Sequence, residues 1–182
     1  MTTLQTAPPS VGRPDASEYA PFYAGYIARV TEDPRTALAS QAKATAGVLQ
    51  RIPESMAGHR YAEGKWTVRD VVGHLADVER IMCCRALRVA RGDATPLPGF
   101  DENAYAEVAG ANSRAWGSLV DELASVRTAT IALFQGLAPD TWQRRGIANG
   151  ATISVRALAH IIVGHERHHL EVLQTRYGLP PR

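Results

Sequence analysis

Apolar residues recur at intervals of three and four positions over four long stretches of the chain, which is the spacing of an amphipathic α-helix. The clearest stripe lies in residues 68–91 and consists of Val68, Val71, Val72, Leu75, Val78, Ile81 and Met82. The same spacing predicts helices over residues 34–52, 113–136 and 154–177. Four long amphipathic helices predict an all-α fold, a four-helix bundle with long crossover connections.

Residues that cap helices stand at the ends of these stretches. Asp33, followed by a proline, and Thr67 precede two of the predicted helices, and their side chains suit the first free N–H groups of a helix. Gly92 and Gly178 follow two predicted helices, as glycine commonly does after a last helical turn. These residues support the predicted helix boundaries.

The remaining segments are shorter or less regular. A short helix is expected over residues 17–30, with Tyr19, Phe22, Tyr23 and Tyr26 on an aromatic face. Residues 93–112 are a connection rich in Pro and Gly, residues 146–150 form a polar loop, and no stretch shows convincing strand alternation. Residues 1–14 are predicted to be a disordered leader, and residues 15–182 a single domain.

Composition narrows the class of protein. Hydrophobic residues make up 45% and charged residues 21% of the 182 residues, which is ordinary for a globular protein. A net charge of +2 without basic clusters speaks against a nucleic-acid partner. No apolar run is long enough to cross a membrane and no signal peptide is recognisable, so a cytoplasmic location is expected. The cysteines, Cys83 and Cys84, are adjacent and unsuited to a structural disulfide.

Histidine provides the candidate chemistry. His165 and His169 belong to the string His-Glu-Arg-His-His and lie one helical turn apart, so both imidazoles can reach one ion. They occupy positions of the apolar stripe where leucine would otherwise fill a core, and His74 occupies such a position on the helix over residues 68–91. Burying three unpartnered imidazoles costs about 1–3 kcal/mol for each unsatisfied group. A shared metal ion would remove that cost.

Each histidine also has a simpler interpretation. A single core histidine such as His74 is more often hydrogen-bonded to a carbonyl than bound to metal. His59 lies in a loop and is expected to be solvated. His160 and His168 are expected at the surface or behind the ligands rather than on the metal.

Several acidic groups near these histidines have open roles. Glu166 is either a general base or an ion-pair partner of Arg167 or Arg85. Asp77, three residues after His74, either orients an imidazole or is a solvated carboxylate. Asp101 and Tyr105, which follow the prolines of the connection, are candidates for the mouth of a pocket. Asp101 is equally a candidate helix N-cap.

The string H-E-x-x-H is also typical of zinc proteases, but its surroundings exclude that class here. Such enzymes need a third ligand beyond the motif, and Glu171 is the only carboxylate in the remaining tail, on the wrong side of the helix. Position 172 is Val and position 175 is Thr, where the extended protease motif has Gly and His. The third ligand must come from upstream, and His74 is the best placed.

Several short motifs follow one another along the chain: Lys65-Trp66-Thr67-Val68-Arg69-Asp70-Val71-Val72-Gly73-His74-Leu75-Ala76-Asp77, Glu79-Arg80, Arg85, Ala90-Arg91-Gly92-Asp93, Pro96-Leu97-Pro98-Gly99-Phe100-Asp101 and Gly164-His165-Glu166-Arg167-His168-His169-Leu170. Taken in this order, they resemble the DinB/YfiT-like superfamily of bacterial four-helix metalloproteins. The resemblance covers the chain from about Pro34 to Leu173. Each motif is weak alone, and their order and spacing make the match specific.

The resemblance implies a divalent metal ion, Zn or Ni, bound by His74, His165 and His169. It further implies a metal-dependent enzyme of the thiol S-transferase or hydrolase type, with a small-molecule substrate that includes a low-molecular-weight thiol in some members. A homodimer is expected, with the aromatic face of residues 19–26 as a candidate contact. The alternative is a stress-response protein that binds a metal or ligand without turnover.

Overall fold

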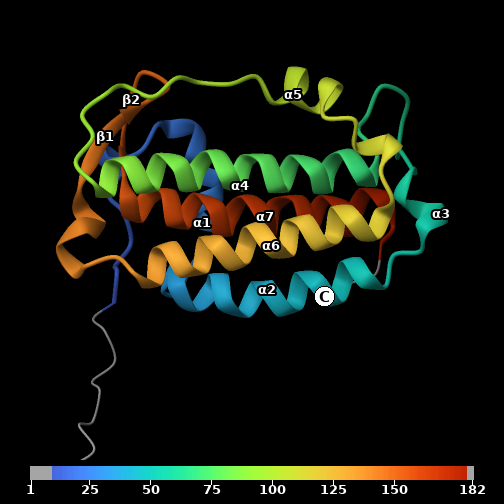
Figure 1. Cartoon of the computed structure of the whole chain (residues 1–182), viewed down its shortest axis with the longest axis horizontal. Helices are drawn as coiled ribbons and strands as arrows, with labels where there is room; N and C mark the ends of the chain where they lie inside the picture. The colour runs from blue at the N-terminus through green and yellow to red at the C-terminus, as the bar shows by residue number, and fades with distance from the viewer. Residues whose placement is uncertain (1–9, 180–182) are drawn as a thin grey trace, which may run out of the picture.

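Four long helices form the body of the protein, as the computed structural model of residues 10–179 shows (Figure 1). They are α2 (Pro34–Gln50), α4 (Val68–Ala90), α6 (Trp116–Gln135) and α7 (Val155–Tyr177). Each lies within one of the four predicted stretches, and the predicted four-helix bundle is confirmed. None of the described helices is long and apolar enough to cross a membrane.

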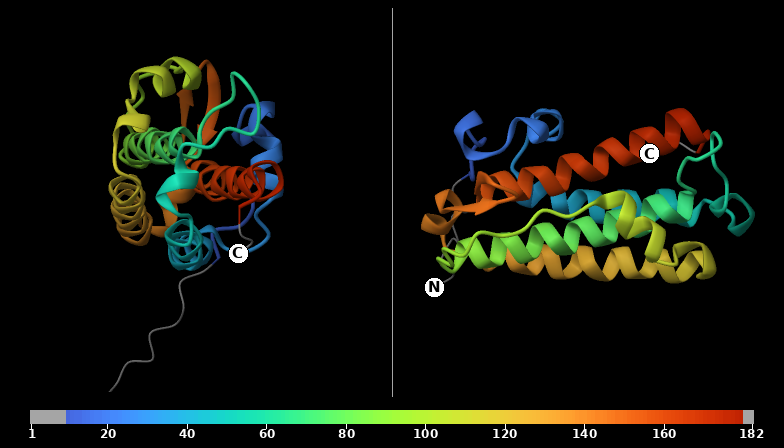
Figure 2. Two further views of the ribbon diagram at one scale, coloured as in Figure 1. Left: turned by 90° about the vertical axis from the view of Figure 1, so that its right-hand side faces the viewer. Right: turned by 90° about the horizontal axis from the view of Figure 1, so that it is seen from above.

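The bundle has two helices in each direction. In Figure 1, α2 and α7 run one way along the bundle while α4 and α6 run the other way. Seen end-on in Figure 2, α6 and α7 each pack against both α2 and α4. The connection from α4 to α6, residues 91–115, therefore returns along the full length of the bundle and covers one face of it.

Shorter elements lie outside the bundle. They are the 3₁₀ turns η1 (Ala16–Glu18), η2 (Pro21–Tyr23), η3 (Ala111–Ser113) and η4 (Pro139–Gln143), and the helices α1 (Ala24–Ala28), α3 (Glu54–Ala57) and α5 (Glu102–Val108). The single helix expected over residues 17–30 is thus divided. Pro21 explains the break, because proline disfavours helical geometry in the residue before it, and Ala20 is extended.

Capping interactions define the helix ends where the sequence places suitable residues. The Asp33 carboxylate accepts a hydrogen bond from the Arg35 backbone N–H at 2.9 Å. Thr67 and Asp70 form a reciprocal capping box at the start of α4, with distances of 3.0 and 2.9 Å. Gly178 ends α7, as predicted, and has the left-handed conformation with φ +67°.

A β-hairpin joins α6 to α7 and corrects the prediction of a polar loop without strands. Strand β1 (Arg145–Ala148) pairs antiparallel with β2 (Ala151–Ser154). The two-residue turn is Asn149-Gly150, with φ angles of 51° and 74°, as hairpins of this length prefer. Leu97 of the long connection donates its backbone N–H to the Ile147 carbonyl at 2.9 Å. The hairpin therefore anchors that connection across the end of the bundle.

The segment before the bundle is bound to it by polar contacts. Residues 1–9 of the predicted leader, and residues 180–182, lie outside the described residues. Within the rest of that leader, the Val11 N–H donates to the Asp33 carboxylate at 3.0 Å. Glu18 is buried and receives a hydrogen bond from Arg156 Nε at 2.8 Å.

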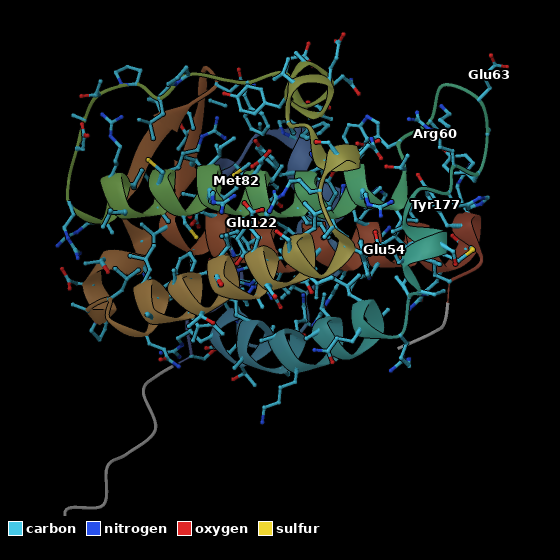
Figure 3. All side chains as sticks on the ribbon, turned by 45° about the vertical axis from the view of Figure 1, so that its right-hand side comes forward. Glu54, Arg60, Glu63, Met82, Glu122 and Tyr177 are labelled. Atoms are coloured by element: carbon cyan, nitrogen blue, oxygen red, sulfur yellow. The ribbon has the colours of Figure 1, made fainter. Side chains whose placement is uncertain are left out.

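A polar contact also joins two segments at the other end of the bundle, where Figure 3 labels Tyr177. The Tyr177 hydroxyl donates a hydrogen bond to the Trp66 carbonyl at 2.7 Å.

The core consists of two apolar clusters separated by a layer of polar side chains. On α7 one cluster uses residues 155–163 and the other residues 170–177, and on α4 the division falls between residues 76 and 78. Buried polar residues from all four long helices occupy this level, and we call them the polar layer: Gln41, Thr45, His74, Glu79, Arg127, Thr130, His165 and Glu166. The candidate chemistry of the chain therefore lies halfway along the bundle.

Candidate metal centre

Three histidines from two helices converge here: His74 and His165 of the polar layer, and His169 one turn further along α7. His74 of α4 has its Nε2 atom 3.1 Å from Nε2 of His165, and Nε2 of His169 is 3.1 Å from the same atom. One ligand atom from each of the three lies within 4.8 Å of the others. The structure thus brings together the three histidines that the apolar stripes and the resemblance selected. Their role as metal ligands stays a prediction.

Aromatic rings fix the orientation of these imidazoles. The Trp66 ring lies against His74 with centroids 4.7 Å apart, and the Tyr26 ring meets His165 edge-on at 5.3 Å. Tyr26 can approach this closely because α1 crosses α7 at Gly164. A Cβ atom on Gly164 would lie 2.0 Å from the Tyr26 carbonyl oxygen, so only glycine fits. The packing of α1 is therefore part of the site.

Burial keeps the three imidazoles uncharged. It lowers the pKa of His74 to about 4. Burial and the nearby His74 and His168 lower the pKa of His169 to about 3. The pKa of His165 is also well below its usual value, first through burial and then through the neighbouring histidines. All three therefore keep a nitrogen lone pair available for coordination at neutral pH.

The donor set suits a divalent transition metal. Neutral imidazole is a preferred ligand of Zn²⁺, and nickel also accepts it. With Zn–N bonds of about 2.0–2.1 Å, two nitrogens on one tetrahedral ion lie roughly 3.3 Å apart. The observed contacts of 3.1 Å to His165 are close to that spacing. A neutral His165 carries at most one Nε2–H and can donate it to only one of its two neighbours. A shared ion would satisfy all three nitrogens.

The cluster opens into a cleft of about 340 Å³ between α4, α7, α1 and the long connection. Its lining combines aromatic and aliphatic side chains with a few polar ones: Phe22, Tyr23, Tyr26, Trp66, His74, Val78, Met82, Arg85, Gly99, Phe100, Glu102, Asn149, Ile161, His165 and His169. Figure 3 labels Met82 on α4, one of these residues. A cleft of this size and character is typical of small-molecule sites.

The other three histidines lie outside the cluster, and one expectation about them needs refinement. His160, expected at the surface or behind the ligands, is buried, and its Nδ1 lies 2.8 Å from the Arg156 carbonyl oxygen. His168 is partly exposed and contacts the Tyr26 ring at 5.6 Å between centroids. His59 is exposed, as expected for a loop residue.

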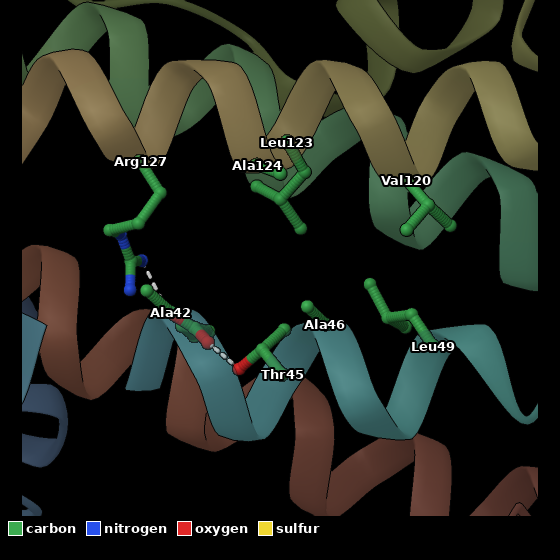
Figure 4. Close-up of a pocket in the computed structure, with 9 residues that line it drawn as sticks. Ala42, Thr45, Ala46, Leu49, Val120, Leu123, Ala124 and Arg127 are labelled. Carbon is green, nitrogen blue, oxygen red and sulfur yellow. Dashed lines mark hydrogen bonds and ion pairs between the residues drawn. The ribbon is translucent and has the colours of Figure 1, made fainter. Parts of the chain in front are cut away.

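Glu166 points to a different side of α7 from the cluster. It is 2% exposed, accepts hydrogen bonds from Thr45 of α2 and Arg127 of α6, and is absent from the lining of the cleft. The ion-pair partners expected from sequence, Arg167 and Arg85, are not its partners. The observed partner is Arg127. Dashed lines in Figure 4 mark the bonds from Arg127 and Thr45.

Arg127 joins two buried carboxylates across three helices. Its Nε and Nη2 donate to the two oxygens of Glu79 at 2.8 Å each, and Nη2 also donates to Glu166. Burial alone lowers the pKa of Arg127, but the two carboxylates outweigh burial and raise it above its usual value. The arrangement ties α6 to α4 and α7 directly behind the histidines.

The remaining acidic candidates are explained by local contacts. Asp77 pairs with Arg80 at 3.5 Å on the surface of α4, which favours the solvated interpretation over a role in orienting His74. Asp101 caps α5, accepting the Asn103 N–H at 2.9 Å. Neither Asp101 nor Tyr105 is among the residues that line the cleft.

Sequence reasoning missed two features that the structure places at the site. Arg127 lies four residues after Leu123 on the apolar stripe of α6, and a charged residue on that stripe predicts a buried ion pair. Arg85 follows His74 by eleven residues on α4, which returns to within about 20° of the same helix face. Both signals were present in the helix periodicity.

Fold and site together define a helical bundle with a three-histidine cluster that lines a cleft. The DinB superfamily model matches residues 37–173, and the chain belongs to this superfamily. No curated protein matches the chain by sequence.

Two solved structures share the fold. YfiT from Bacillus subtilis, described as a probable metal-dependent hydrolase with an unusual four-helix bundle topology, superposes with a TM-score of 0.67 at 20% identity, covering 90% of this chain and 95% of that one. The mycothiol-dependent maleylpyruvate isomerase superposes with a TM-score of 0.61 at 17% identity. That match covers 75% of this chain and 58% of the isomerase. At these identities the likeness establishes the fold alone.

Proposed function

We propose that the chain is a metal-dependent enzyme, of the hydrolase or thiol S-transferase type, acting on a small molecule in the cleft. The observation that carries the proposal is the convergence of three uncharged imidazoles, those of the buried His74 and His165 and of the partly buried His169, at a cleft of about 340 Å³. The relatives add support by analogy, since one is described as a probable metal-dependent hydrolase and another as a thiol-dependent isomerase.

In this proposal each residue has a separate task. His74, His165 and His169 hold a divalent ion, Zn or Ni. When bound, such an ion acts as a Lewis acid and lowers the pKa of a coordinated water or thiol towards neutrality. Trp66 and Tyr26 restrict the imidazole rings to their observed orientations. The aromatic walls bind the apolar part of the substrate and exclude water.

Glu166 receives a structural role in this proposal. Its carboxylate is engaged by Arg127 and Thr45 on the side of α7 that faces α2 and α6. A general base has to reach the proton it abstracts, within hydrogen-bond distance or through one water. A carboxylate held by a buried guanidinium and absent from the cleft lining does not meet that condition, so no proton transfer is assigned to Glu166.

Metal content tests the first half of the proposal. The purified full-length chain should contain about one zinc or nickel ion, measured by elemental analysis, and His74→Ala and His169→Ala should each lose it. His168→Ala is the matched control, because His168 is adjacent to His169 but lies outside the cluster, and it should retain the ion. Full metal content in both His74→Ala and His169→Ala would refute the site.

Turnover tests the second half. The metal-loaded protein should accelerate hydrolysis of simple esters, opening of epoxides, or addition of thiols to electrophiles, and His169→Ala should abolish that acceleration. A protein that binds metal as described yet accelerates none of these reactions would support the non-catalytic alternative, a metal-binding or ligand-binding protein.

Light scattering on the same sample tests the expected homodimer. A purely monomeric profile would exclude it.

A further inference from the structure

A buried cation lines the same cleft. Arg85 of α4 is 4% exposed and is one of the lining residues. Its observed contacts are a hydrogen bond from Nη2 to the Pro98 carbonyl at 2.6 Å, a weak contact from Nη1 to the Met82 sulfur at 3.7 Å, and the Phe100 ring, 5.7 Å from the guanidinium carbon. Within the described part of the chain Arg85 forms no ion pair.

An uncompensated buried guanidinium is unusual. Buried charges are normally paired, because removing an ion from water costs several kcal/mol. Guanidinium carries five N–H donors, and only two acceptors, one of them a thioether, are observed. Arg127, which is also buried inside the bundle, differs from Arg85 in that it pairs with two carboxylates. Arg85 therefore has donors and charge to offer a ligand.

Arg85 and the histidines face the same space. Eleven residues separate His74 from Arg85, so their Cα atoms lie about 16 Å apart along α4 and within about 20° of the same face. Side chains of a helix lean towards its N-terminus, which brings Arg85 towards His74. A ligand that touches both residues has to be elongated, with an apolar middle part against Val78 and Met82, which lie between them.

The geometry points to an elongated organic carboxylate as the ligand class of this cleft, with its acid group on Arg85 and its reactive end at the three histidines. Planar guanidinium and carboxylate groups match in a two-bond arrangement, which favours a carboxylate over a neutral acceptor. Glu102 is the one carboxylate among the lining residues; it is exposed on α5 and has no ion pair with Arg85. This inference rests on the proposed function for the identity of the reactive end.

Two probes of nearly the same shape, one charged and one neutral, test the inference. They are 4-phenylbutanoate and its amide, 4-phenylbutanamide, titrated calorimetrically into the full-length protein. A carboxylate also binds metal directly, so each titration is repeated with His169→Ala, which removes a proposed ligand. Arg85→Met removes the guanidinium. Arg88→Met is the matched control, because Arg88 lies on the same helix but pairs with Asp93 outside the cleft.

The measured quantity is the ratio of the two dissociation constants. A charge-assisted hydrogen bond predicts that the carboxylate binds about tenfold more tightly than the amide, or better. We expect this ratio in wild type, His169→Ala and Arg88→Met, and a ratio near one in Arg85→Met. If Arg85 only holds the connection in place through its hydrogen bond to the Pro98 carbonyl, Arg85→Met would change both affinities together and leave the ratio unaltered.

Three outcomes would overturn the inference. They are a ratio near one in wild type, an unchanged ratio in Arg85→Met, and the absence of measurable binding by both probes. If Arg85→Met fails to fold, a crystal structure of the wild-type complex decides, with the carboxylate either on the guanidinium or on the histidines alone. Wild-type protein that binds no metal and yet keeps the Arg85-dependent ratio would refute the proposed function while the ligand class stands.

Discussion

The buried network of Glu79, Arg127 and Glu166 predicts a large and specific stability effect. The guanidinium of Arg127 is 5% exposed, and the two carboxylates are 4% and 3% exposed. Replacing Arg127 by methionine preserves much of the side-chain volume but leaves two buried carboxylates facing each other without a counter-charge. Three long helices, α4, α6 and α7, are then no longer joined by a common polar group.

The expected magnitude follows from the hydrogen bonds that Arg127 makes. It donates three hydrogen bonds to carboxylates, two of them in a bidentate arrangement with Glu79. Breaking a buried ion pair from one side costs about 3–5 kcal/mol, because a charge stays buried without compensation. For a chain of this size, 1 kcal/mol corresponds to roughly 2–4 °C in Tm, so Arg127→Met should melt roughly 6–20 °C below wild type.

Urea unfolding followed by circular dichroism measures the change in the free energy of unfolding. The exposed Arg80→Met is the control: Arg80 pairs with Asp77 and Glu122 at the surface, and its removal should cost at most about 1 kcal/mol. Adding Glu79→Gln to Arg127→Met removes one orphaned charge and should recover part of the stability, as a double-mutant cycle would quantify. A destabilisation by Arg127→Met no larger than that by Arg80→Met would refute the reasoning.

Substitutions at three further positions test individual features of the fold. Gly164→Ala should lose about 1–3 kcal/mol in denaturant unfolding, because its Cβ would collide with the Tyr26 carbonyl. Burial raises the pKa of Glu18, but hydrogen bonds from Arg156 and the backbone outweigh it and lower the pKa to about 2. The stability contributed by Glu18 is thus present above pH 4.5 and lost towards pH 2; acid titration of unfolding should show wild type losing on the order of 3 kcal/mol more than Glu18→Gln. Asn149→Ala should cost about 1 kcal/mol in thermal unfolding, because Asn149 has φ 51°, whereas Asn149→Gly should keep the turn.

The long helices were predictable because their signals are local and repeated. Each stripe extends over many turns, and the caps at Asp33 and Thr67 act within three residues along the chain. The break at Pro21 is also local, and its effect on Ala20 was available in the sequence. The helix period does not predict which helix packs against which, because many arrangements of four helices bury the same stripes.

The sequence pattern did not predict the hairpin, and there is a physical reason for this. Its strands have four residues each, too few for alternation to stand out, and only Ala148, Ile153 and Ser154 in the two strands are buried. The usable signal was the dipeptide Asn149-Gly150, which favours a two-residue turn with positive φ. Its contact with the long connection, through Leu97, depends on tertiary structure and has no local signature.

The histidine cluster was predictable from stripe positions, whereas the pairing of the polar groups around it was not. His74, His165 and His169 each replace an apolar residue on a core-facing stripe, so their convergence follows once two stripes face each other. The partner of Glu166 depends on the register of α6 against α7, which brings Arg127 to its carboxylate. Sequence spacing instead favours a neighbour on the same helix, and for this reason it indicated Arg167; Arg85 lies on α4, and no spacing along the chain relates it to Glu166.

The role of Glu166 shows how a bundle changes the meaning of H-E-x-x-H. Adjacent residues of a helix point about 100° apart, and in this bundle Glu166 contacts Thr45 and Arg127 and is not among the residues that line the cleft. On a helix buried on several sides, each face meets a different neighbour: the histidines meet α4 and the cleft, and Glu166 meets α2 and α6. The polar layer therefore has two parts, one that offers uncharged nitrogens to the cleft and one that binds the helices together behind them. Because the second part holds α7 in place, removal of Arg127 should also disturb the cluster, and metal content of Arg127→Met should fall although no histidine is changed.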